Sequence, residues 1–151
     1  MSDPLPSRPG AAPFTLRLTP AEVTGFLTAA FPSSDPSKLG QVVSLVPGHL
    51  RIRLDPDAST LRPGNIVSGP TLMTLADLAA YAVIAAHHGP EQMAVTNALS
   101  ISFLRACNHR AIYADARLLK LGRRLASVDV RIWQDSEDRL IAQSTVGYAL
   151  P

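Results

Sequence analysis

Residues 68–88 constrain the fold of this chain more than any other stretch. They read SGPTLMTLADLAAYAVIAAHH, and apolar side chains occupy nearly every helical face. A helix that is apolar all round is predicted to lie in a protein core. Between residues 66 and 86, Asp77 is the one charged side chain. Because an unpaired buried carboxylate is costly, we expect Asp77 to mark a catalytic or ligand-binding site. The alternative is a carboxylate at the solvent edge of the helix, or one that pairs with an arginine.

This helix is not predicted to cross a membrane. Its apolar part, residues 72–86, is about 15 residues long, fewer than the roughly 20 that a bilayer requires. A charge near its centre is also costly in lipid. The chain opens without the apolar segment of a secretory signal. We therefore expect a cytoplasmic protein with no membrane partner.

The N-terminal region predicts a tail followed by a short helix. Residues 1–13 contain four prolines and almost no periodicity, which is typical of a flexible tail. Residues 14–151 are expected to form a single domain. The sequence TPAEVTGFLTAAFP has Thr19 as N-cap, Pro20 at the first helical position and Glu22 two residues later, which predicts a capping box.

The remaining segments alternate with the period of β-strands. Two short strands are expected around a turn at residues 47–48, and in the second of them Leu50, Ile52 and Leu54 alternate with polar residues, as in a half-buried strand. Four more strands follow residue 88. Short connections predict an antiparallel sheet, and one long helix lying on that sheet makes an α+β domain.

Composition excludes several kinds of site. The net charge of +2 is too small for a typical nucleic-acid-binding protein. The single cysteine, Cys107, excludes an internal disulfide, and we expect its thiol to be inert. No metal-ligand spacing is present, so neither a metal nor a cofactor is expected. A P-loop is disfavoured because Pro70 stands where the motif needs lysine. His87 and His88 are expected to compensate the dipole at the end of the helix.

Four segments together resemble a known family. They are SGPTLMTLADLAAYAVIAA, AVTNALSISFLRA, LGRRLASVDVRIW and LIAQSTVGYAL, in that order. They are similar to the PaaI-like acyl-CoA thioesterases of the 4-hydroxybenzoyl-CoA thioesterase superfamily, and the likeness covers roughly residues 41–150. The resemblance implies a hotdog fold, in which an antiparallel sheet wraps around one long central helix. It also implies hydrolysis of an acyl-CoA thioester to a carboxylic acid and CoA.

The resemblance also implies roles for particular residues. The family's helix carboxylate falls on Asp77, as general base or nucleophile, and the glycine whose N–H polarises the thioester carbonyl falls on Gly69. The hydroxyl that helps to place the water matches Thr96. The family's His-Gly-Gly helix entry reads Ser68, Gly69 and Pro70 here. Where the family often has asparagine, this chain has Arg62, and the nearby Asn65 is a candidate substitute.

Spacing adds a constraint on assembly. Gly69 and Asp77 lie eight residues apart on one helix, or ~12 Å along its axis. At that distance we do not expect both residues of one chain to reach the same carbonyl carbon. We therefore expect a homodimer with shared active sites, either alone or within a dimer of dimers, and the resemblance also implies a dimer.

Basic residues gather in the second half of the chain. Between residues 105 and 124, six arginines and lysines face one aspartate, Asp115. We expect Arg105, Arg123 and Arg124 to contact the CoA phosphates; the alternative is a solvated sheet edge. Ser68 and Arg62 keep open a second function, a noncatalytic acyl-CoA-binding or small-ligand-binding protein. A hydratase is a weaker alternative, because the start of the helix has no histidine. The identity of the acyl group is not predicted.

Overall fold

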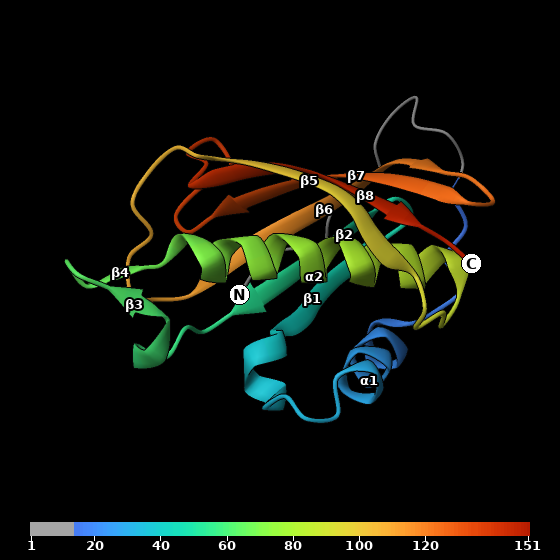
Figure 1. Cartoon of the computed structure of the whole chain (residues 1–151), viewed down its shortest axis with the longest axis horizontal. Coiled ribbons are helices and arrows are strands. Elements are labelled where there is room, and N and C mark those ends of the chain that lie inside the picture. Colours follow the sequence, from blue (N-terminus) through green and yellow to red (C-terminus); the bar gives the residue numbers. More distant parts are fainter. Residues whose placement is uncertain (1–13) are drawn as a thin grey trace.

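A six-stranded antiparallel sheet wraps around the long helix α2, Gly69–His88 (Figure 1). The computed structural model describes residues 14–151, and the tail predicted for residues 1–13 lies outside the described residues. The strand order is β1 (Gln41–Val46), β2 (His49–Leu54), β6 (Ile112–Leu121), β7 (Leu125–Trp133), β8 (Ala142–Ala149) and β5 (Val95–Phe103). The predicted α+β hotdog fold is confirmed.

The first helix, α1 (Pro20–Ala30), begins as the sequence predicts. The Thr19 hydroxyl accepts a hydrogen bond from the Glu22 N–H, and the Glu22 carboxylate accepts one from the Thr19 N–H. Val23, Phe26 and Leu27 are buried against the rest of the protein. The 3₁₀ helix η1 (Pro36–Leu39) connects α1 to β1. In Figure 1, α1 and η1 lie on the side of α2 away from β5, β7 and β8.

The central helix α2 packs against β2, β6, β7 and β8. Ser68 is its N-cap and accepts a hydrogen bond from the Thr71 N–H, and Gly89 with a φ of 113° ends it. By length and composition α2 could cross a bilayer, but 67% of its most apolar stretch is buried inside the protein. This is the environment of a core helix, and Ala76, Ala79 and Ala80 are fully buried.

His87, in the last turn of α2, differs from its prediction. It is 4% exposed, its Nε2 accepts a hydrogen bond from the Gly48 N–H, and its Nδ1 lies 2.8 Å from the Val83 carbonyl oxygen. Because Nε2 is an acceptor, the ring is neutral, and burial lowers its pKa. We had expected His87 to bring a positive charge to the end of the helix. Its neutral ring does not, so this prediction is wrong.

The second strand, β2, also differs from its prediction. Its alternation predicted a half-buried strand, yet His49 and Arg51 are buried on the face turned away from α2. The Arg51 Nε lies 2.7 Å from the Asp115 carboxylate of β6, and the Trp133 Nε1–H of β7 donates to the same carboxylate at 2.8 Å. Side chains of neighbouring strands therefore cover these polar groups.

The segment between β2 and α2 contains short elements that the sequence pattern did not predict. It includes the 3₁₀ helix η2 (Ala58–Thr60) and the short strands β3 (Leu61–Arg62) and β4 (Ile66–Val67). The two strands pair as a small separate hairpin, and Asn65 takes a left-handed φ of 59° in its turn. This hairpin lies beside the start of α2 (Figure 1).

Candidate active site

Asp77 lies on α2 beneath the paired strands β5 and β8. Its Oδ1 accepts hydrogen bonds from the Thr96 Oγ1 of β5 at 2.6 Å and from the Tyr148 hydroxyl of β8 at 2.7 Å. Thr96 and Tyr148 are direct partners in the strand register, which brings both hydroxyls to one point above the helix. We expected Asp77 to be buried, but it is only half-buried. Within residues 14–151 it forms no ion pair, so its charge is held by neutral hydroxyl donors.

Tyr148 is a member of this site that the sequence reasoning missed. It is 3% exposed, and burial raises the pKa of its phenol, as does the hydrogen bond to Asp77. Tyr148 therefore stays protonated and remains a donor. The alternating pattern of residues 142–149 predicted only that alternate side chains face the core. Its pairing with Thr96 depends on the order of strands in the sheet, which the sequence pattern does not supply.

A cavity of about 360 Å³ opens beside Asp77. Thr74, Asp77, Leu78 and Tyr81 of α2 form one wall, and these positions share one helical face. The aromatic rings of Phe31, Tyr81 and Tyr148 also line the cavity, with centroid separations of 5.8 Å and 5.9 Å about Tyr81. A partly apolar cavity that contains a carboxylate and several hydroxyl groups is a typical small-ligand site.

The start of α2 lies apart from this cavity in the same chain. Gly69 is the first residue of the helix, and a Cβ placed on it would lie 3.4 Å from the Phe103 ring. Amide groups in the first turn have no partner within the helix, so they are available to an anionic or polarised oxygen. Gly69 and Asp77 do not line a common cavity within residues 14–151.

The remaining residues predicted near the helix start have local roles in this chain. The Ser68 hydroxyl caps α2 and lies 2.8 Å from the Thr71 hydroxyl. Arg62 is exposed, and its Nε donates to the Pro63 carbonyl oxygen. Asn65 is exposed in the turn between β3 and β4. None of these three residues lines the cavity beside Asp77.

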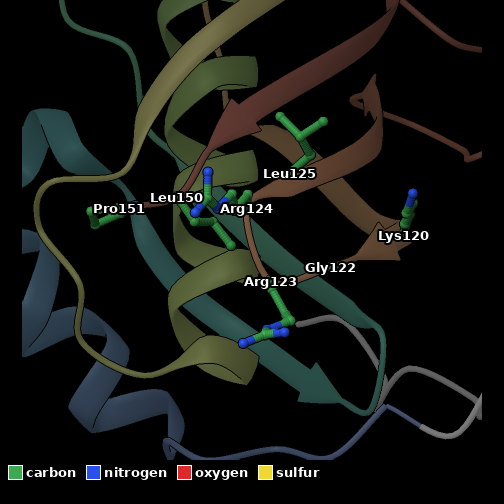
Figure 2. A pocket seen from close by; sticks show the side chains of 7 residues that line it. All are labelled: Lys120, Gly122, Arg123, Arg124, Leu125, Leu150 and Pro151. Carbon is green, nitrogen blue, oxygen red and sulfur yellow. The ribbon is translucent and has the colours of Figure 1, made fainter.

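Two of the three predicted phosphate-binding arginines lie together. Arg123 and Arg124 belong to the turn between β6 and β7, and with Lys120 and Leu150 they line a pocket of about 860 Å³ (Figure 2). In this view the guanidinium groups of both arginines lie on the side of Leu150, whereas the Lys120 ammonium points away from them. Arg105 lines a different, smaller pocket, and its Nη1 donates to the Leu140 carbonyl oxygen at 2.9 Å.

Other candidate chemistry receives no support from the described residues. Cys107 is buried, and burial raises the pKa of its thiol to about 11, so the reactive thiolate is scarce near neutral pH. Among residues 14–151, no group of three His, Cys, Asp or Glu side chains is arranged to hold a metal ion. Asp77 and its two hydroxyl partners therefore remain the candidate catalytic groups.

The chain is similar to proteins of known family and structure. Its sequence matches the family model "Thioesterase superfamily" over residues 64–141. A solved structure of a proposed thioesterase from Silicibacter sp. TM1040 is 33% identical, with a TM-score of 0.79, covering 91% of this chain and 95% of that one. Zebrafish thioesterase superfamily member 2 is 23% identical, with a TM-score of 0.77, covering 89% of this chain and 100% of that one.

A third similar structure is a Streptococcus mutans UA159 protein bound to acetyl-CoA. It is 22% identical, with a TM-score of 0.64, and the match covers 73% of this chain and 86% of that one. A comparison with curated protein sequences finds no match.

Proposed function

The chain belongs to the thioesterase superfamily, a family of thioester hydrolases, and on that premise we propose that it hydrolyses an acyl-CoA with Asp77 as the catalytic carboxylate. The observation that carries the proposal is the hydrogen bonding of Asp77. Thr96 and Tyr148 hold one of its oxygens, and no cation within residues 14–151 neutralises it. A carboxylate held in this way keeps the capacity to accept a proton.

The proposed reaction is a direct attack by water. Asp77 takes a proton from a water molecule, and the water oxygen forms a bond to the carbonyl carbon of the thioester. The C–S bond then breaks, and the proton returns to the departing thiolate, which leaves as CoA. The charge that develops on the carbonyl oxygen needs a fixed donor, and the Gly69 N–H at the positive end of a helix suits that role. Direct attack by Asp77, giving an anhydride, is the alternative route.

The donor must come from a second subunit, and β5 supplies a means of assembly. β5 is an edge strand of nine residues, VTNALSISF, with no charged side chain and mostly exposed positions. A long uncharged edge is a template for pairing with another strand. Antiparallel pairing of two β5 strands would set the Val95 end of one subunit against the Phe103 end of the other.

That pairing would bring the two halves of the site together. Thr96, near the Val95 end, hydrogen-bonds Asp77, and at the other end the Phe103 ring lies beside the start of α2, 3.4 Å from where a Cβ on Gly69 would be. The carboxylate of one subunit would therefore lie near Gly69 of the partner subunit. We propose a homodimer of this kind with two shared active sites.

The substrate's CoA part is proposed to bind the basic pocket between β6 and β7. The Leu150 N–H bonds the Arg124 carbonyl oxygen, and Ala149 pairs with Val95, so this pocket lies near the same end of β5 as Thr96. Guanidinium groups suit phosphates. The acetyl-CoA bound to the Streptococcus mutans protein supports a CoA ligand.

The test is hydrolysis of a panel of acyl-CoAs, followed with a thiol-detecting reagent, for the wild-type protein and Asp77→Asn. The amide is nearly isosteric but cannot act as a base, so we expect kcat to fall about 10²–10⁴-fold. Asp138→Asn, which changes an exposed carboxylate, is the matched control and should leave kcat unchanged. We also expect a lower KM for acyl-CoA than for the same acyl group on a pantetheine-like thiol.

Two results would contradict the proposal. Equal kcat values for the wild-type protein and Asp77→Asn would remove Asp77 from the mechanism. Tight binding of acyl-CoA without turnover of any panel member would instead favour a noncatalytic acyl-CoA-binding protein.

A further inference from the structure

A second cavity adjoins the one that contains Asp77. It measures about 200 Å³ and lies between α2, η1 and the segment of residues 54–60. Lys38, Thr74 and Leu78 line both cavities, so these side chains form the divider between them. The proposed reaction assigns no role to the second cavity.

The two cavities follow one another along α2. The first is lined by residues 74, 77, 78 and 81 of the helix, and the second by residues 71, 74, 75 and 78. Each set has the spacing of a single helical face, and the second is displaced by three residues, or ~4.5 Å, toward the start of the helix. Both are lined by residues of η1 and lie next to one another along the helix, on either side of the divider.

Tyr81 lines the first cavity at the end away from the divider, and its side chain is held by several contacts. The Tyr81 ring contacts the rings of Phe26, Phe31 and Tyr148, and its hydroxyl donates to the Gln92 carbonyl oxygen at 2.9 Å. A ligand that outgrows the first cavity is therefore directed away from Tyr81 and toward the divider.

The second cavity has an apolar floor. Leu54, Leu75 and Leu78 are 6%, 2% and 8% exposed, whereas the rim is polar. At that rim the Lys38 ammonium lies 3.8 Å from Asp57, and both side chains are about half exposed. An exposed ion pair of this length restrains its lysine weakly, so the Lys38 part of the divider can move aside.

We propose that the acyl chain of the substrate runs from Asp77 beneath α2, past Lys38 and Leu78, into this second cavity. The proposal rests on the proposed function, and it names the substrate class: straight apolar acyl groups long enough to cross the divider. The second cavity favours longer acyl chains, because each methylene group that it buries improves substrate binding by roughly a factor of four.

Two serines allow a matched test. Ser34 lines only the first cavity and Ser37 only the second, and both are exposed residues of the segment that joins α1 to β1. Ser37→Trp should lower kcat/KM at least tenfold for long-chain acyl-CoAs and leave short-chain acyl-CoAs unchanged. Ser34→Trp should lower kcat/KM for all chain lengths.

Binding of unreactive thioethers separates this inference from the proposed function. Titration calorimetry with S-butyl-CoA and S-dodecyl-CoA should show tighter binding of the dodecyl compound to the wild-type protein, and Ser37→Trp should abolish that difference. This outcome supports the inference even if no acyl-CoA is hydrolysed. The inference is overturned if the wild-type protein does not prefer S-dodecyl-CoA, or if Ser37→Trp leaves the preference intact or weakens both compounds equally.

Discussion

At the scale of single residues, Asp77 and Asp115 hold their charges in opposite ways. Asp115 is 1% exposed and is surrounded by Arg51, His49 and the Trp133 N–H. Asp77 is only half-buried and is held by two hydroxyls. The more deeply buried carboxylate is neutralised by its partners and is therefore structural. The carboxylate with neutral partners keeps the charge that a base requires.

Tyr148→Phe tests whether the hydroxyl positions Asp77. The variant keeps the buried ring and removes one of the two donors, so Asp77 should lose its orientation while the core stays packed. We expect kcat to fall about tenfold, in line with the loss of one hydrogen bond to a charged group. Steady-state kinetics and thermal unfolding measured together distinguish this outcome from a loss of folding.

The matched control is Tyr113→Phe. Tyr113 stacks on Trp133, on the face of the sheet away from α2, so its hydroxyl is remote from Asp77. An equal fall in kcat for both variants would show that Tyr148 has no specific role in positioning Asp77.

At the scale of elements, a charge cluster joins β2, β6 and β7 on the outer face of the sheet. Burial raises the pKa of Asp115, but the nearby His49 ring and the hydrogen bonds from Arg51 and Trp133 outweigh that effect and hold this pKa well below its usual range. Arg51 also bonds Glu137, in the turn that precedes β8. The cluster therefore ties three strands and a turn together through side chains.

Asp115→Asn should lower the free energy of unfolding by about 3–5 kcal/mol at pH 7, because it leaves the buried Arg51 without its buried carboxylate partner. The lowered pKa of Asp115 means that its contribution is complete above the unfolded-state pKa of about 3.9 and is lost as the pH falls toward the folded-state value. The stability gap between the wild-type protein and the variant should therefore narrow below about pH 4. Urea unfolding of both proteins at pH 7, 4 and 3 measures this difference in stability.

Asp135→Asn is the control for this cluster. Asp135 pairs with Arg110 but is 69% exposed, so its loss should cost less than about 1 kcal/mol. A similar loss for both variants, or a gap that does not change with pH, would contradict the stabilising role of Asp115.

At the scale of the whole molecule, the proposed site requires two chains. Asp77→Asn and Gly69→Pro each remove a different half of it, the base or the N–H. A mixed dimer of the two variants has one site with both defects and one site with neither. After subunit exchange, about half of the dimers are mixed, so roughly a quarter of wild-type activity should return. The measurement is hydrolysis before and after exchange.

Gly69→Ala is the control for the helix start. It retains the N–H, and its methyl group would meet the Phe103 ring at 3.4 Å, so it should remain active. Folding of each variant and exchange of subunits are verified first. If both hold and no activity returns, the cross-subunit site is wrong.

The sequence alone determined the two α-helices, the six strands of the main sheet, the fold class and the position of Asp77 on its helix. Helices and sheets impose periods of 3.6 and 2 on the pattern of apolar residues, so the capping box at Thr19 and the apolar helix around Asp77 can be recognised locally. Composition also made Asp77 stand out, since no other charge lies between residues 66 and 86.

The tertiary structure decided what each polar side chain contacts. Tyr148 reaches Asp77 across 71 residues, Arg51 reaches Asp115 across 64, and Gly48 reaches His87 across 39. Local periodicity says which face of an element is apolar, but not which element will cover it. The sequence therefore predicted β2 as half-buried, although neighbouring side chains cover both of its faces. The pairing of Thr96 with Tyr148 likewise depends on β5 lying beside β8 in the sheet. The strand order and side-chain packing determine these contacts, because they bring together residues that are distant in the chain.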